Sequence, residues 1–257
     1  DKKNLKLFDN KIREVKNPKI LIAGCGTGQH PIETAAKIED SKVIAIDLSL
    51  SSLAYAKRKT KELGVQNIEY IQADILELET LKERFDLIES VGVLHHMEDP
   101  IMGWHVLSNC LRAGGLMRIG LYSELARQDI VKLREEILET GIGSNDFAMK
   151  LFRQNMINSK KNHYKQILDS NDFFSLSEFR DLLFHVQEHR FTIPEIKESL
   201  FNLGLKFCGF DSEKLISEFK LDNIDKEDLY NLDKWHVFEE ANSRAFVGMY
   251  QFWCQKI

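Results

Sequence analysis

Between residues 19 and 122, short apolar runs alternate with stretches that have helical spacing. Strands that alternate with helices of about 10–15 residues are typical of βαβ units, whose strands lie parallel in one sheet. The runs are almost wholly apolar rather than alternating, which indicates strands covered by helices on both faces. The runs are residues 19–23, 42–47, 67–73, 85–90 and 115–122. This pattern predicts an α/β fold with a doubly wound, mostly parallel sheet.

The alternation of apolar runs and helical stretches stops after Tyr122 and resumes near Thr192, which predicts a helical insertion within the core. Thr192 suits a helix cap and Pro194 a first-turn position. Asn17-Pro18 marks an earlier boundary, because proline disfavours helix at the residue before it. We expect a lead-in helix over 1–18, the core over 19–122, a helical cap over 123–190 and the end of the core over 191–257. That last segment is expected to contain a helix, a strand at 205–210, a helical insertion at 212–242 and a terminal strand at 245–254.

Composition narrows the class of protein. Hydrophobic residues make up 43% of the 257 residues and charged residues 29%, as in ordinary globular proteins. The net charge of −5 argues against a nucleic-acid partner, and no apolar run approaches the roughly 20 residues of a membrane span. The four cysteines lie far apart without a C-x-x-C motif, which predicts reduced thiols and a cytoplasmic location. The sequence begins at Asp1 rather than Met, which leaves open an upstream domain or protein partner.

A glycine-rich turn, Gly24-Cys25-Gly26-Thr27-Gly28, directly follows the first apolar run and opens a helix. Glycine is needed where φ is positive or where a ligand approaches the backbone closely. A dinucleotide fingerprint would place its third glycine at position 29, which is Gln29. The turn therefore indicates a ligand or a close helix, and Gln29 opposes an NAD-dependent enzyme.

Two carboxylates follow the next predicted strands. Asp47 ends the second strand, where it can accept both hydroxyl groups of a ribose, and Asp74 follows the third, where it can hold an adenine amino group. The alternative is that both merely cap helices, as aspartates at strand ends often do. Three such strand ends together favour a nucleoside site, because ligands of these sheets bind at the carboxyl edge.

Four segments carry a family resemblance: ILIAGCGTG at 20–28, AID at 45–47, QADI at 72–75 and FDLIESVGVLHH at 85–96. They resemble the successive motifs of class I S-adenosylmethionine (AdoMet)-dependent methyltransferases, in particular bacterial ones that are sometimes fused to helical repeat domains. The resemblance implies a Rossmann-like, seven-stranded sheet and AdoMet as the cofactor.

The resemblance also implies a role for each strand end. The glycine turn would hold the methionine part of AdoMet, Asp47 the ribose and Asp74 the adenine. The expected cofactor-binding residues are Gly24, Cys25, Gly26, Thr27, Gly28, Gln29, Asp47, Leu48, Asp74, Ile75, Ser90 and Val91, with the last two near the sulfonium end. One departure is Ile22, where the family usually has an acid. Glu89 or backbone carbonyls are the alternatives for organising the methionine ammonium group.

Methyl transfer requires mainly that the acceptor be aligned, and orientation alone can supply roughly 7–11 kcal/mol. A general base is needed only for an acceptor that arrives protonated, so no single residue type is diagnostic. His95 follows the fourth strand and Tyr122 ends the fifth, so both are candidates at the reaction centre. The alternatives are that His95 packs or caps the next helix and that Tyr122 is a core aromatic.

The 123–190 insertion combines many aromatic residues with a polar cluster at its end, and a helical cap of this kind would exclude water from a small acceptor. His185, Glu188 and His189 match the H-x-x-E-H zinc-peptidase pattern, with the histidines at i and i+4 of a helix. A peptidase would leave the AdoMet motifs unexplained, so no metal is predicted. The three residues either anchor the cap to the core or contact the substrate.

Together these patterns predict an AdoMet-dependent methyltransferase that acts on a small molecule bound under a helical cap. Three alternatives stay open. The enzyme could methylate a protein or peptide, the chain could be a non-catalytic AdoMet-binding regulatory module, or it could use NAD, which Gln29 opposes.

Overall fold

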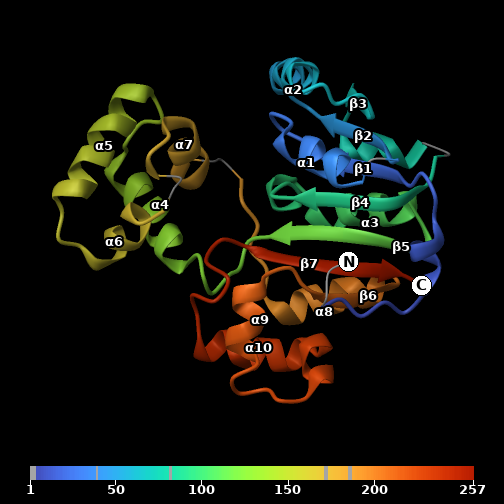
Figure 1. Ribbon diagram of the computed structural model, residues 1–257. Coiled ribbons are helices and arrows are strands. Elements are labelled where there is room, and N and C mark those ends of the chain that lie inside the picture. Colours follow the sequence, from blue (N-terminus) through green and yellow to red (C-terminus); the bar gives the residue numbers. More distant parts are fainter. Residues whose placement is uncertain (1–3, 39, 81–82, 171–172, 185–186) are drawn as a thin grey trace.

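A computed structural model describes residues 4–38, 40–80, 83–170, 173–184 and 187–257. Seven strands form one sheet in the order β3-β2-β1-β4-β5-β7-β6 (Figure 1). The strands are β1 Lys19–Ala23, β2 Lys42–Asp47, β3 Ile68–Gln72, β4 Phe85–Val91, β5 Leu111–Leu121, β6 Leu205–Phe210 and β7 Tyr250–Lys256. The first five are parallel, and β7 pairs antiparallel with both β5 and β6. The predicted seven-stranded, mostly parallel α/β fold is confirmed.

Helices cover both faces of the sheet, as the apolar strands predict. On one face, Ala35 of α1 and Leu53 of α2 pack with Ile20 and Ile22 of β1. On the other face, a larger core joins alternate strand residues such as Leu21 to α3, α8 and α10. The core helices are α1 Gln29–Lys37, α2 Leu50–Glu62, α3 Pro100–Cys110, α8 Ile193–Asn202, α9 Glu213–Phe219 and α10 Leu232–Ala241. Short 3-10 helices are η1 Asn10–Glu14, η2 Ile75–Thr80, η3 Leu94–His96 and η5 Lys226–Tyr230.

Four further helices form a separate group beyond the carboxyl ends of the parallel strands (Figure 1). They are α4 Gln128–Thr140, α5 Asp146–Asn158, α6 Asn162–Leu168 and α7 Leu176–Phe184. We call this group the helical module. It has an apolar core of its own, which includes Leu133, Met149, Phe152 and Phe179. Two strand-like segments join it to the sheet, where Ser123 bridges Phe191.

Three predicted elements differ in the structure. Of the lead-in helix expected over 1–18, residues 1–3 lie outside the described residues and 4–18 form only η1, because the side chain of Gln255 binds the backbone of Phe8 and Asp9 just before it. The fifth strand begins at Leu111 rather than at 115, and it includes Gly114. The terminal strand begins at Tyr250 rather than at 245, because the preceding residues turn and bury Phe246 in the core.

The described part of the zinc-peptidase pattern is not helical. Helix α7 ends at Phe184, and Gln187–Arg190 has no helical structure. The backbone of this stretch bonds to the loop after β4, since His189 N donates to the carbonyl of His95 over 2.8 Å. In the described part of the chain, no helix is long and apolar enough to cross a membrane.

Candidate functional site

The glycine turn between β1 and α1 is shaped by close packing. Gly24, Gly26 and Gly28 have φ values of 79°, 51° and 92°. A Cβ atom at Gly24 would lie 2.2 Å from Val93 Cγ2, and one at Gly28 would lie 2.6 Å from Ala56 Cβ. A Cβ atom at Gly26 would meet no atom within 4 Å. Packing therefore requires the outer two glycines, whereas Gly26 leaves its backbone open to a ligand.

A cavity of about 310 Å³ lies beside this turn at the carboxyl ends of the strands, and we call it the cofactor cavity. Its lining residues are Gly24, Gly26, Ile46, Asp47, Leu48, Ala73, Asp74, Ile75, Gly92, Val93, His96 and Met97. The predicted residues outside this lining are Cys25, Thr27, Gly28, Gln29, Ser90 and Val91. Burial, helped by the charge of Asp47, raises the pKa of Cys25 to about 12, so its thiol stays protonated at neutral pH.

The two predicted acids make different local contacts. Asp47 accepts hydrogen bonds from Gly26 N over 2.7 Å and from Ser49 N over 2.8 Å. The cap of α2 is Ser49, so Asp47 ties the glycine turn to the end of β2 rather than capping that helix. Asp74 Oδ1 accepts from Leu76 N over 2.9 Å at the start of η2. Asp74 therefore has both a local structural contact and a place on the cavity wall.

The two histidines after β4 have different environments. His95 is fully buried, and its ring stacks on Tyr122 with 3.7 Å between ring centroids. His96 lines the cofactor cavity, and its Nδ1 lies 3.2 Å from the carbonyl oxygen of Gln187. The sequence pointed to His95, whereas the structure places His96 on the cavity wall.

Several lining residues were missed by reasoning from the sequence: Ile46, Ala73, Gly92, Val93, His96 and Met97. Gly92 follows β4 with a φ of 79°, as Gly24 follows β1, and this repeated pattern of a strand followed by glycine is a signal that the sequence contains. The apolar members carry no such signal, because their residue types are common in any core.

Ile22 stands where the family usually has an acid, and an acid, Glu89, lies beside it on the neighbouring strand. Glu89 of β4 is the direct cross-strand partner of Ile22 in the parallel register, so both side chains lie on the same face of the sheet. Its carboxylate lies 2.6 Å from His30 Nε2, 3.2 Å from Thr34 Oγ1 and 3.2 Å from Arg118 Nη1. Burial opposes ionisation, but His30 and Arg118 outweigh it and lower the pKa of Glu89. The negative charge therefore sits beside α1 and outside the cofactor cavity lining.

A second cavity, of about 450 Å³, lies between the helical module and the core, and we call it the acceptor cavity. Its lining residues are Tyr122, Ala126, Arg127, Asp129, Ile130, Ile167, Asp169, Ser170, Leu182, Arg244, Val247, Gly248, Met249 and Gln251. Tyr122 is clamped there, because the guanidinium of Arg127 lies 3.5 Å from its ring centroid and His95 stacks on the ring. This stack holds the end of β5 against the helical module.

The carboxylate of Glu188 binds two arginines of the helical module and its N-terminal cap. It accepts from Arg127 Nε over 3.0 Å and Nη2 over 2.8 Å, and from Arg134 Nη2 over 2.9 Å, with 1% of its side chain exposed. This geometry fits the anchoring hypothesis for Glu188. His189 donates its backbone N–H to His95, and His185 lies outside the described residues. Across the described ranges, no group of three His, Cys, Asp or Glu side chains could hold a metal ion.

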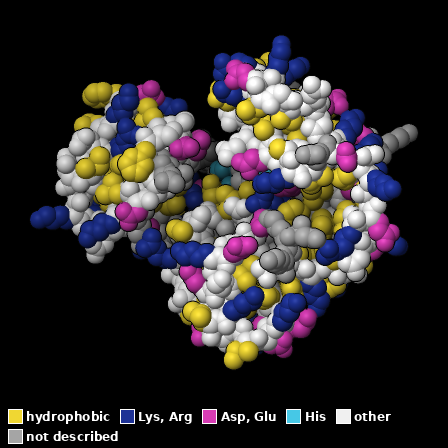
Figure 2. Space-filling model, viewed as in Figure 1, with side chains coloured by type: hydrophobic (Ala, Val, Ile, Leu, Met, Phe, Trp, Pro, Cys, Tyr) yellow, Lys and Arg dark blue, Asp and Glu magenta, His cyan; other side chains and the backbone are white. Residues whose placement is uncertain are grey.

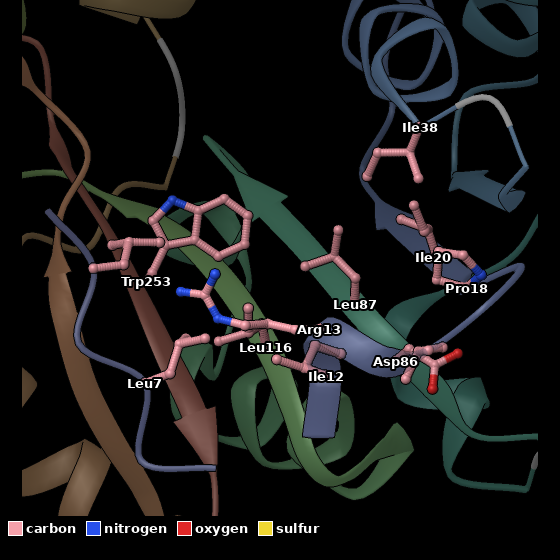
Figure 3. Close-up of a pocket in the computed structure, with 12 residues that line it drawn as sticks. Leu7, Ile12, Arg13, Pro18, Ile20, Ile38, Asp86, Leu87, Leu116 and Trp253 are labelled. Carbon is pink, nitrogen blue, oxygen red and sulfur yellow. The ribbon is translucent and has the colours of Figure 1, made fainter. Parts of the chain in front are cut away.

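A third cavity, of about 330 Å³, lies between the N-terminal segment and the sheet (Figure 3). Apolar side chains such as Leu7, Ile20, Leu87 and Trp253 surround it. It lies near the amino ends of β1 and β4, whereas ligands of such sheets bind at the carboxyl ends. We therefore do not assign the reaction to this cavity.

Comparison with known proteins identifies the domain. Residues 20–115 match the family model of a methyltransferase domain. With the seven-stranded fold and the strand-end residues around the cofactor cavity, this match shows that the chain carries a class I AdoMet-dependent methyltransferase domain, whose cofactor is S-adenosylmethionine.

The relatives define the resemblance more closely. The chain is 30% identical over 205 residues to the uncharacterized protein syc1184_c of Synechococcus sp., covering 77% of this chain and 49% of that protein. It is 24% identical over 225 residues to a malonyl-[acyl-carrier protein] O-methyltransferase of Paenibacillus sp., covering 87% and 75%. The structure of PKMT2 from Rickettsia typhi in complex with AdoHcy shares the fold, with a TM-score of 0.69, 18% identity, and coverage of 93% of this chain and 49% of that one. The chain thus spans about half the length of the Synechococcus and Rickettsia proteins.

Proposed function

We propose that this domain transfers the methyl group of AdoMet to a small molecule bound in the acceptor cavity. One contact carries the proposal. Gly92 lines the cofactor cavity, Met249 lines the acceptor cavity, and a Cβ atom at Gly92 would lie 3.8 Å from Met249 Cε. Direct transfer needs the two ligands side by side, and Gly92 and Met249 bring a residue of each cavity lining close together.

The residues around the cofactor cavity fit AdoMet. Gly26 leaves its backbone open to the methionine part, Asp47 and Leu48 lie where the ribose would bind, and Asp74 and Ile75 lie where the adenine would bind. The remaining predicted contacts stay predictions: Cys25, Thr27, Gly28 and Gln29 lie in or beside the glycine turn, and Ser90 and Val91 lie within two residues of Gly92 in the chain.

AdoMet supplies a methyl group on a positively charged sulfur, which needs no further activation. The protein must therefore orient the acceptor and exclude water. We assign the orienting role to Tyr122, which lines the acceptor cavity, and removal of a proton from a protonated acceptor to His96. Their rings lie 5.9 Å apart, and His95 packs against both as a positioning residue.

The acceptor cavity supports a small-molecule substrate, because its 450 Å³ falls within the range of about 300–1,000 Å³ typical of such sites. A second candidate is the side chain of a protein. The observation that favours it is the open cleft between the helical module and the α1–α2 part of the core, with histidine at its floor (Figure 2). A cleft that opens to solvent leaves room for a larger partner.

Methyl transfer from AdoMet carrying a radiolabelled methyl group tests both candidates, with cell extract separated into small-molecule and protein fractions. We expect label in the small-molecule fraction and its loss in the Tyr122→Phe and His96→Ala variants. Label in protein would support the second candidate. Calorimetric AdoMet binding without transfer would support a regulatory module, and preference for NAD would contradict the proposal.

A further inference from the structure

Gln251 in the wall of the acceptor cavity is fixed in one orientation by Arg118. Arg118 Nη2 lies 2.8 Å from Gln251 Oε1. A guanidinium has only N–H donors, so the amide must turn its oxygen toward Arg118. The Nε2 group, with two donors, then faces away from Arg118, and no described residue accepts a hydrogen bond from it. The cavity wall at Gln251 therefore offers donors rather than acceptors.

Arg118 is itself held on two further sides. Its Nη1 lies 3.2 Å from Glu89 Oε2, and its Nε lies 2.9 Å from Asp211 Oδ2. The side chains of Glu89 and Asp211 are 6% and 12% exposed, so both ion pairs are largely shielded from water. The guanidinium cannot turn without breaking a buried ion pair. Because the guanidinium is fixed, the Gln251 amide that accepts its hydrogen bond is also held in one orientation.

The lining of the acceptor cavity also contains two arginines. Arg127 lines the cavity and shares the single carboxylate of Glu188 with Arg134, both within 3.0 Å. Arg244 also lines the cavity, and no carboxylate of the described residues lies within ion-pair distance of it. Two cationic side chains therefore line the same cavity as the donors of Gln251.

Asp129 and Asp169 line the cavity from the side of α4 and α6. A negatively charged group is repelled by these acids and attracted to Arg244 and to the N–H donors of Gln251. We propose that Gln251 is a specificity-determining residue that selects an acceptor carrying a carboxylate, whose oxygens accept hydrogen bonds from Gln251 Nε2 and Arg244. This inference rests on the function proposed above, because it names the substrate class of the same cavity.

The test measures binding of sodium benzoate and benzylamine, two probes of similar size and opposite charge, to the chain saturated with S-adenosylhomocysteine. Chemical-shift titration is expected to show benzoate binding about tenfold tighter than benzylamine. Gln251→Glu keeps a partner for Arg118 but presents only acceptors, so benzoate affinity should fall at least tenfold. Gln251→Met, of similar length, should show a smaller loss of about threefold.

Arg118→Lys tests the constraint itself. Lysine keeps a charge for Glu89 but cannot bind Glu89, Asp211 and Gln251 at once, so the amide is free to turn. The ratio of benzoate to benzylamine affinity should then fall toward one, although the fold is kept. A purely structural role of Arg118 would weaken both probes equally.

Two results would overturn the inference: no preference for benzoate in the wild-type chain, whether from equal binding or from none, and full benzoate affinity in Gln251→Glu. Calorimetry of S-adenosylhomocysteine on every variant separates this failure from failure of the proposed function. If S-adenosylhomocysteine does not bind, the methyltransferase assignment fails. If it binds with unchanged affinity and the benzoate preference is absent, only the acceptor class fails.

Discussion

The cofactor cavity and the acceptor cavity are built in different ways. Every residue that lines the cofactor cavity lies between positions 24 and 97, mostly just after a strand. The acceptor cavity draws residues from 122 to 251, and long-range contacts hold it: Arg127–Glu188 spans 61 positions and Arg118–Gln251 spans 133. Local backbone geometry thus makes the first cavity, whereas a few buried polar contacts assemble the second. Variants should therefore separate them.

The largest effect is expected for Glu188→Ala. It leaves Arg127 and Arg134 buried without their carboxylate, and breaking a buried ion pair in this way costs about 3–5 kcal/mol. The loss should be concentrated in the helical module, so S-adenosylhomocysteine affinity should fall by less than about threefold. Urea unfolding and calorimetry measure the two quantities.

The matched control is Glu139→Ala on α4, because Glu139 is exposed and should change stability by no more than about 0.5 kcal/mol. Equal losses of stability in the two variants would show that Glu188 does not anchor the helical module. An equally large loss of S-adenosylhomocysteine affinity would show that the two cavities are not separable.

Substitutions in the glycine turn should disrupt the cofactor cavity instead. Gly24→Ala places a methyl group 2.2 Å from Val93 at a positive φ, and strain with overpacking is expected to cost about 2–4 kcal/mol. Gly26→Ala meets no atom within 4 Å, so only the backbone cost of roughly 1–2 kcal/mol applies. We expect Gly24→Ala to unfold earlier in thermal melts, and Gly26→Ala to weaken S-adenosylhomocysteine binding with the smaller loss of stability. The reverse order would contradict the packing argument.

Asp47→Asn should reduce S-adenosylhomocysteine affinity by about 10–100-fold, since hydrogen bonds to a charged group contribute about 1.5–3 kcal/mol. Its carboxylate holds Gly26 N and, as proposed, the ribose. Glu79→Gln, an exposed acid in η2, is the control and should leave the affinity within about twofold. Calorimetry that found both variants alike would remove Asp47 from the binding site.

The features that the sequence could predict belong mostly to the cofactor cavity rather than to the acceptor cavity. The five parallel strands, the turn at Gly24–Gly28 and the acids Asp47 and Asp74 were predictable, because apolar runs and strand-end residues carry local signals. The choice between His95 and His96 was not. Which neighbour faces the cavity depends on the stacking of His95 on Tyr122, a contact across 27 positions.

The acceptor cavity was even harder to predict from the sequence. Gln251 looks like any polar residue near a terminal strand, and its constraint comes from Arg118 on a strand that pairs with β7. From the sequence, Glu188 could either anchor the cap or contact the substrate, and in the structure it binds arginines that are 54 and 61 positions away. Long-range ion pairs of this kind have no sequence period, so only the folded structure reveals them.

The smallest effect separates two buried acids by the sign of their pH dependence. His30 and Arg118 lower the pKa of Glu89 in the core beside α1, whereas burial raises the pKa of Glu239, which accepts from Ser123 and Tyr250 near the acceptor cavity. A lowered carboxyl pKa contributes stability that is present above the ordinary value and is lost as the pH falls through the folded value. A raised one has the opposite sign, so its ionisation removes stability as the pH rises through the folded value.

Glu89→Gln should therefore cost about 1–2 kcal/mol at neutral pH and progressively less below the ordinary carboxyl pKa, because the wild-type contribution is lost there. Glu239→Gln should compare increasingly well with the wild-type chain as the pH rises, because glutamine does not ionise. Urea unfolding from pH 4 to pH 8 measures both differences. Parallel profiles for the two variants would mean that the two carboxyl groups titrate alike, and the opposite electrostatics inferred for the two regions would then be wrong.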